Sequence, residues 1–166
     1  METIRNEIEA DVVEIRAVHA ACFPTAAESR LVDLLRSAGR LSVSLVAEER
    51  GRIIGHVAFS PVTAGSGDAG AGLAPIAVIE PERDRGVGMR LVRAGLDACR
   101  EAGFGWVVVL GEPEYYGRFG FRPASEFGLS DEYGGGGAFQ ALELVHGSLP
   151  SAAGLVRYAP EFASLE

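Results

Sequence analysis

The chain has 166 residues, enough for one domain with its own core, and its 48% hydrophobic and 23% charged residues exclude an intrinsically disordered chain. A formal net charge of -8 has the wrong sign for a protein that binds nucleic acid or an anionic membrane surface. The charged N-terminus does not resemble a leader and the sequence has no run of about 18 apolar residues, so we expect a cytoplasmic protein with a single domain over residues 1–166.

The first half of the chain predicts one strand, two helices and then three antiparallel strands. Weak alternation over residues 3–8 predicts the first strand, and helical spacing of apolar residues predicts helices over 11–23 and 26–38. Two strand-like runs, 42–48 and 52–62, flank a short charged turn that ends in Gly51, which is typical of a hairpin. The Gly- and Ala-rich residues 65–72 predict a loop before a strand over 73–79.

The second half opens with the helix that has the clearest periodicity, residues 86–103, followed by an apolar strand over 104–110. Glu112, Pro113 and Glu114 then predict the start of a short helix, since proline and acidic residues suit a first turn. Four consecutive glycines at 134–137 predict a surface loop, and residues 139–146 predict the last strand.

The cysteine and histidine residues do not suggest a metal site or a disulfide. Cys22 and Cys99 lie far apart within helical patterns, where free, buried thiols are expected. His19, His56 and His146 have no metal-ligand spacing, so no metal is expected. No serine lies in the G-x-S-x-G pattern of a nucleophile elbow either.

The most informative segment joins a predicted strand to the clearest helix. It consists of Arg83, Asp84, Arg85, Gly86, Val87, Gly88 and Met89. Glycines at a helix entrance let backbone N–H groups approach an oxyanion, and the helix dipole adds positive potential there. The segment lacks the G-K-[ST] of a P-loop and the third glycine of a dinucleotide fingerprint. We therefore expect it to hold a phosphate group of another kind of ligand.

The pattern Arg83-x-x-Gly86-x-Gly88 resembles the acyl-CoA signature Q/R-x-x-G-x-G/A of the GNAT superfamily. Upstream, residues 76–79 resemble the fourth strand of that family, and Tyr116 with Gly120 and Phe121 resembles its Tyr-x-x-x-Gly-Phe segment. The resemblance covers nearly the whole chain. It implies an α/β (α+β) fold with a mixed, mostly antiparallel, splayed sheet of about six to seven strands flanked by about four helices.

The resemblance also implies where acetyl-CoA binds. The backbone of residues 83–89 would hold the pyrophosphate, with the side chains of Arg83 and Arg85 adding contacts. The fourth strand would splay from the fifth and bind the pantetheine arm through Ile76, Ala77 and Val78, with main-chain bonds from Ile76 and Val78. Many relatives carry an Asn after the fifth strand, whereas this chain has Gly111, Glu112 and Pro113.

Acyl transfer from a thioester to an amine requires a proton for the departing thiolate and a route for the proton of the amine. The resemblance places Tyr116 as the proton donor, and Tyr115 is the weaker claimant. Glu28, Glu80 and His56 are candidates for relaying the amine proton, although each residue type is also common in a purely structural role.

We therefore expect an N-acetyltransferase that moves an acetyl group from acetyl-CoA to a primary amine of a small molecule or peptide by direct attack in a ternary complex. A non-catalytic acyl-CoA sensor and a transferase for longer acyl groups stay open as alternatives. No nucleic-acid or membrane partner is expected, and association into a homodimer is left open.

Overall fold

The computed structural model of the protein describes residues 2–65, 68–83, 85–149 and 154–165. The strands in these ranges are β1 (Thr3–Asn6), β2 (Val43–Glu49), β3 (Arg52–Ala64), β4 (Asp68–Val78), β5 (Trp106–Leu110), β6 (Arg122–Pro123), β7 (Leu129–Asp131), β8 (Phe139–Glu143) and β9 (Gly154–Arg157). The α-helices are α1 (Val12–Cys22), α2 (Ala27–Ser37), α3 (Val87–Glu101) and α4 (Pro113–Gly117). Short 3-10 helices are η1 (Glu9–Asp11), η2 (Glu80–Glu82), η3 (Ala124–Phe127), η4 (Gly136–Ala138) and η5 (Pro160–Leu165).

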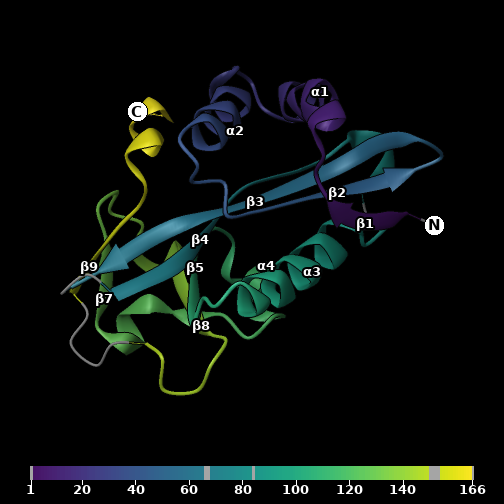
Figure 1. Ribbon diagram of the computed structural model, residues 1–166. Helices are drawn as coiled ribbons and strands as arrows, with labels where there is room; N and C mark the ends of the chain where they lie inside the picture. Colours follow the sequence, from purple (N-terminus) through teal and green to yellow (C-terminus); the bar gives the residue numbers. More distant parts are fainter. Residues whose placement is uncertain (1, 66–67, 84, 150–153, 166) are drawn as a thin grey trace.

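One mixed sheet joins the strands in the order β1-β2-β3-β4-β5-β8-β6, and β9 pairs with β3 and β7. The pairs β4–β5 and β7–β9 are parallel and the others are antiparallel. The helices α1 and α2 lie on one face of the sheet, and α3 and α4 lie on the other (Figure 1). The predicted fold class is therefore confirmed.

The predicted number of six to seven strands is too low, because nine strands occur in the described ranges. The additional strands are short, with two residues in β6, three in β7 and four in β9. Segments of this length show no measurable alternation. The expectation that residues 139–146 form the last strand is wrong for the same reason, since β9 follows β8.

The hairpin of β2 and β3 is confirmed by its turn residues. Arg50 and Gly51 have φ angles of 53° and 77°. Positive φ at both central residues is characteristic of the type I′ turn, whose twist matches that of two antiparallel strands. The turn places Glu49 opposite Arg52, and a register shift between Ala47 and Glu48 then brings Val46 opposite His56.

The loop expected over residues 65–72 is mostly strand, because β4 already begins at Asp68. Residues 66–67 lie outside the described residues, and Gly70 and Gly72 allow close packing without breaking the sheet. A Cβ atom at Gly70 would lie 2.4 Å from the Trp106 ring, and one at Gly72 would lie 2.8 Å from the Tyr158 ring. Large aromatic side chains therefore pack directly on the backbone of β4.

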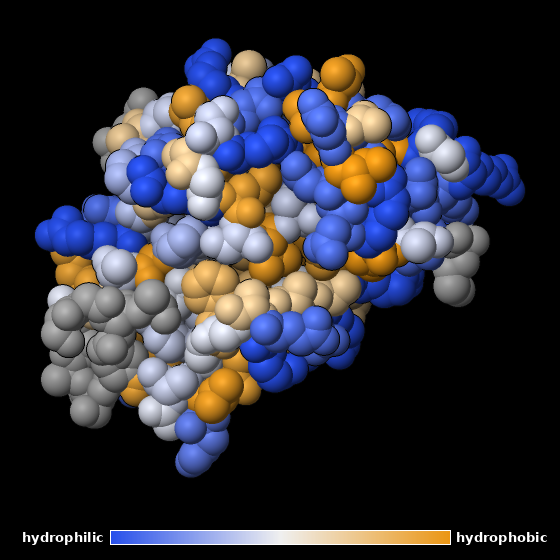
Figure 2. Space-filling view, viewed as in Figure 1, coloured by the Kyte–Doolittle hydropathy of each residue, from blue (hydrophilic) through white to orange (hydrophobic). Residues whose placement is uncertain are grey.

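Each face of the sheet carries its own part of the core. Leu91 and Val92 of α3 pack against one face, together with Val107 and Val109 of β5. The other face packs against α2 and η5. Figure 2 shows hydrophobic residues exposed at the surface between the side of the molecule that carries α1 and α2 and the side that carries α3 and α4, and hydrophilic residues border them. Among the described residues, no helix has both the length and the apolar composition that a membrane crossing requires.

Candidate functional site

The two central parallel strands separate partway along their length. β4 and β5 pair only at Ala71–Val107, Gly72–Val108 and Leu73–Val109, although β4 continues to Val78. The second half of β4 is held on one side by β3, and no strand of the described residues pairs with it on the side where β5 has diverged. The sheet is therefore splayed at this point, as the sequence predicted.

The free edge of β4 is formed by two of the predicted site residues. The N–H group of Ile79 donates to Ile54 on β3 over 3.0 Å. Because main-chain groups alternate along a strand, Ile76 and Val78 point theirs away from β3, and Ala77 points toward it. The carbonyl of Val78 accepts a hydrogen bond from Nε of Arg83 at 2.9 Å. Cys22 Sγ also donates to this carbonyl at 3.3 Å, so the edge offers the main-chain groups of Ile76 and the N–H group of Val78.

The chain leaves this edge through η2 and enters α3 at Gly86. Gly86 has a φ of 80°, a left-handed conformation that favours glycine, and it is the N-cap of α3. A Cβ atom at Gly88, in the first turn, would lie 3.1 Å from the hydroxyl of Tyr115. The first N–H groups of a helix lack partners within the helix, so they are available to a ligand here.

A cleft of about 570 Å³ lies at this helix entrance, which is the size of a ligand site. Its lining includes Val78, Glu82, Arg83, Gly86, Val87, Gly88, Met89, Tyr115 and Arg118. The structure thus brings together Val78 and five residues of the predicted segment 83–89. The predicted residue Asp84 lies outside the described residues.

Charged side chains give the cleft a net positive lining. Arg85 is not among its lining residues, and the Arg85 guanidinium donates to Glu82 at 2.8 and 2.9 Å. This ion pair offsets the one acidic side chain among the lining residues. Arg83 and Arg118 form no ion pair with a described acidic side chain, so their charges remain available to an anionic ligand.

Arg118 is a lining residue that sequence reasoning missed, and Tyr115, which the sequence suggested only as the weaker claimant to the proton-donor role, also lines the cleft. Arg118 follows α4, with its guanidinium 5.9 Å from the centre of the Tyr115 ring. Both residues lie in the segment that resembles the family motif around Tyr116, so this resemblance was the one sequence feature that could have pointed to them. The motif itself does not say which of its side chains face the cleft.

Tyr116 lies on α4 beside the point where β5 ends. A Cβ atom at Gly111, directly after β5, would lie 2.4 Å from the Tyr116 ring. The ring packs edge-on against Tyr115 and Phe121, and the side chain is buried. Burial, together with the neighbouring Tyr115, raises the pKa of Tyr116 to about 12. The hydroxyl therefore keeps its proton at neutral pH.

The carboxylates considered for proton relay differ in their surroundings. Glu80 is an exposed residue of η2. Glu28 lies in the first turn of α2, and its Oε1 atom is buried without a hydrogen-bond partner among the described residues. A buried carboxylate oxygen without a donor is costly, so Glu28 is the more unusual of the two.

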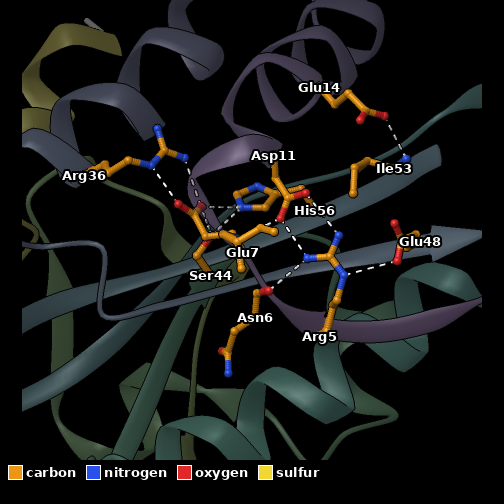
Figure 3. Close-up of polar contacts among 11 residues, drawn as sticks. Arg5, Asn6, Glu7, Asp11, Glu14, Arg36, Ser44, Glu48, Ile53 and His56 are labelled. Atoms are coloured by element: carbon orange, nitrogen blue, oxygen red, sulfur yellow. Dashed lines mark hydrogen bonds and ion pairs between the residues drawn. The ribbon is translucent and has the colours of Figure 1, made fainter. Parts of the chain in front are cut away.

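His56, the remaining candidate, is fully buried in a chain of polar groups (Figure 3). Arg36 binds Glu7 at 2.8 and 2.9 Å, and the Glu7 carboxylate accepts from the hydroxyl of Ser44. The Ser44 oxygen then accepts from Nε2 of His56 at 2.7 Å. This order of donors places the proton of His56 on Nε2.

The chain of polar groups ends at His19, whose Nε2 donates to Nδ1 of His56 at 2.8 Å. Nδ1 of His19 is then the unprotonated nitrogen, and it is buried with no partner among the described residues. Burial lowers the pKa of His19 to about 4 and lowers that of His56 well below its usual value. Both rings are therefore neutral, and the polar groups hold α1 and α2 on the sheet.

This histidine pair predicts a loss of stability in mild acid. The unfolded state takes up a proton on each ring below pH 6.5, and the folded state does not until far lower pH. Lowering the pH from 6.5 to about 4 should therefore reduce the free energy of unfolding, by about 3 kcal/mol for His19 alone. Urea unfolding at several pH values measures this.

The matched variants are His19→Phe, which removes one titrating ring, and His146→Asn, which alters an exposed histidine. His19→Phe should flatten the dependence of stability on pH between 6.5 and 4.5. His146→Asn should leave it as in the wild type. An unchanged slope in His19→Phe would mean that His19 does not resist protonation in the folded state.

In the described part of the chain, no three His, Cys, Asp or Glu side chains gather as a metal site would require. Comparison with known proteins points instead to a family of transferases. The model of the acetyltransferase (GNAT) family matches residues 12–121. The N-acetyltransferase YhbS of Escherichia coli K12 is 41% identical over 162 residues, which span 96% of this chain and 97% of that protein.

Two solved structures agree along nearly the full length. The crystal structure of E. coli YhbS in complex with CoA has a TM-score of 0.93 and covers 98% of this chain and 92% of its own. A GNAT family acetyltransferase from Brucella melitensis in complex with acetyl-CoA is 38% identical. Its TM-score is 0.82, and the match covers 98% of both chains.

Proposed function

The chain belongs to the acetyltransferase (GNAT) family, and we propose that it transfers the acetyl group of acetyl-CoA to a primary amine by direct attack on the thioester. One observation carries the proposal. The cleft at the α3 entrance reaches Val78 on the free edge of β4, so one continuous site would serve both the phosphates and the thioester.

The pyrophosphate is assigned to the backbone of residues 83–89. Glycine at 86 and 88 adds no side chain to the first turn of α3, and the N–H groups there would point at the ligand. Arg83 and Arg118 line the cleft and supply charge-assisted hydrogen bonds. The lining therefore suits a ligand that carries several phosphate charges.

The pantetheine arm is assigned to the free edge of β4, where it would replace the strand that β5 no longer supplies. Ile76 and Val78 provide the main-chain groups. The N–H group of Val78 would bind the acetyl carbonyl and stabilise the negative charge that develops on its oxygen. Arg83, whose Nε binds the Val78 carbonyl, connects this part of the site to the phosphate part.

In the proposed reaction the amine nitrogen forms a bond to the acetyl carbon and the carbon–sulfur bond breaks. The departing thiolate takes the proton of Tyr116, which is protonated at neutral pH and regains a proton from solvent before the next turnover. The nitrogen must be neutral to attack, and it loses a further proton afterwards. Glu28, with its unpartnered buried oxygen, is the favoured acceptor of that proton, and Glu80 is the alternative.

The direct test is release of free CoA from acetyl-CoA in the presence of a panel of amines. Acetylated amine should appear in equal amount, and no acetylated protein should accumulate, since a direct attack has no acyl-enzyme intermediate. A burst of CoA without amine would contradict the direct attack.

We expect Arg83→Ala to weaken CoA binding by about 10- to 100-fold, which is the loss of one charge-assisted hydrogen bond. Arg122 is the matched control, since it is an exposed arginine whose ion-pair partner, Glu126, lies outside the cleft. Titration calorimetry with CoA should show an unchanged affinity for Arg122→Ala. Equal losses in the two variants would mean that Arg83 has no specific phosphate contact.

A further inference from the structure

A second pocket, of about 300 Å³, lies beside the splay. Leu73 and Ala74 of β4 form one wall of it, and Leu110 at the end of β5 forms another. The C-terminal segment closes it with Tyr158, Phe162 and Leu165. Tyr133, from the loop before the four glycines, completes the lining. The pocket is thus built almost entirely from apolar and aromatic side chains.

This pocket and the CoA cleft approach the splay from opposite faces of the sheet. Val107 and Val109 of β5 pack on the α3 face, where Tyr116 also lies. Trp106 and Val108 pack on the other face with Phe162. Because side chains alternate along a strand, the side chain of Leu110 lies on the same face as those of Trp106 and Val108. A ligand in the pocket would therefore meet a thioester at the free edge of β4 from the side opposite α3.

One lining residue, Tyr158, has a polar group without a partner among the described residues. The Tyr158 side chain is 8% exposed, and its ring packs on the backbone of β4 at Gly72. Its hydroxyl oxygen is buried and makes no hydrogen bond within the described residues. Such a group costs stability unless a ligand or water binds it. Burial and the nearby carboxylates of Asp131 and Glu132 raise its pKa, so the hydroxyl stays neutral in negative surroundings.

We propose that this pocket binds the acceptor, a primary amine attached to a compact apolar group the size of one aromatic ring or a branched alkyl chain, and that the Tyr158 hydroxyl accepts a hydrogen bond from its nitrogen. The inference rests on the proposed acetyl transfer and specifies its substrate class. The apolar walls bury the carbon skeleton, and the amine supplies the polar atom that the hydroxyl lacks. Polyamines and basic peptides fit less well, because no described residue that lines the pocket carries a charge to pair with their further charges.

Binding is tested apart from turnover, by titrating amines into the protein saturated with CoA. The probes are 2-phenylethylamine and 3-methylbutylamine, with ethanolamine and putrescine as hydrophilic counterparts. The apolar amines should bind at least about tenfold more tightly, because only they remove apolar surface from water. Equal or tighter binding of the hydrophilic amines would overturn the proposal.

Two variants locate the binding. Leu165 is 41% exposed, so Leu165→Trp fills the pocket from its rim without disturbing the core, and it should reduce apolar-amine affinity at least about tenfold. Val145→Trp, at a 51% exposed position that does not line the pocket, should have no effect. Unchanged affinity in Leu165→Trp would place the amine elsewhere.

Tyr158→Phe removes the hydroxyl and keeps the ring. It should raise the KM of the best-binding apolar amine about tenfold, leaving the KM of acetyl-CoA unchanged, as expected for one lost hydrogen bond to the acceptor. An unchanged amine KM would refute the role of the hydroxyl. Two other results would contradict the proposed acetyl transfer and not the pocket: CoA does not bind, or the amines that bind, apolar or hydrophilic, are not acetylated.

Discussion

Gly88→Glu is expected to abolish CoA binding, with a loss of affinity of at least about 100-fold. Gly88 lies in the first turn of α3 and lines the cleft. A Cβ atom there would lie 3.1 Å from the Tyr115 hydroxyl, so a long side chain must displace Tyr115 or enter the cleft. Its carboxylate would also occupy the helix N-terminus and repel the phosphates. Titration calorimetry with CoA measures the loss, and circular dichroism checks the fold.

Two companion variants separate charge from bulk and from a general effect of added acid. Gly88→Gln introduces the same bulk without charge, and it should bind CoA more weakly than the wild type but more tightly than Gly88→Glu. A Cβ atom at Gly137 would have no neighbour within 4 Å, and its φ is not positive, so Gly137→Glu adds the charge harmlessly elsewhere. Wild-type affinity in a folded Gly88→Glu protein would move the phosphate site away from α3.

The helix-entrance segment 83–89 could be predicted because it is contiguous in the sequence. Gly86 and Gly88 stand close together at a helix start, and the pattern that places them there is local. The hairpin turn at Arg50 and Gly51 is local in the same sense. Features of this kind depend on backbone conformation over a few residues, which composition and spacing report directly.

Features that depend on distant contacts could not be predicted. Residues 65–72 have the composition of a loop, yet Gly70 belongs to a strand because Trp106 packs on it. The second pocket joins β4, the end of β5 and η5, which no spacing in the sequence connects. Tyr158 has no signal in the sequence at all, since its significance lies in a hydroxyl without a partner among the described residues.

Tyr116→Phe is expected to lower turnover by about 100-fold or more and to leave acetyl-CoA affinity nearly unchanged, because the proton is needed mainly in the transition state. A pKa of about 12 keeps the hydroxyl protonated throughout the usual assay range. The wild-type rate should therefore rise toward about pH 10 as the amine loses its proton, with no falling limb from the tyrosine. Steady-state CoA release and a separate binding titration measure the two effects.

Tyr115→Phe is the matched control, because Tyr115 is the adjacent residue and lines the CoA cleft, whereas Tyr116 packs beside the end of β5. Tyr115→Phe should keep turnover within about threefold of the wild type, since its hydroxyl has no assigned proton to give. The reverse pattern, with turnover lost in Tyr115→Phe and kept in Tyr116→Phe, would transfer the role of proton donor to Tyr115.

Full turnover in both variants would mean that neither tyrosine donates the proton, and that the Val78 N–H group and the placement of the amine account for the rate. Tight acetyl-CoA binding with no acetylation of amines that bind the protein would favour a sensor that uses the same cleft.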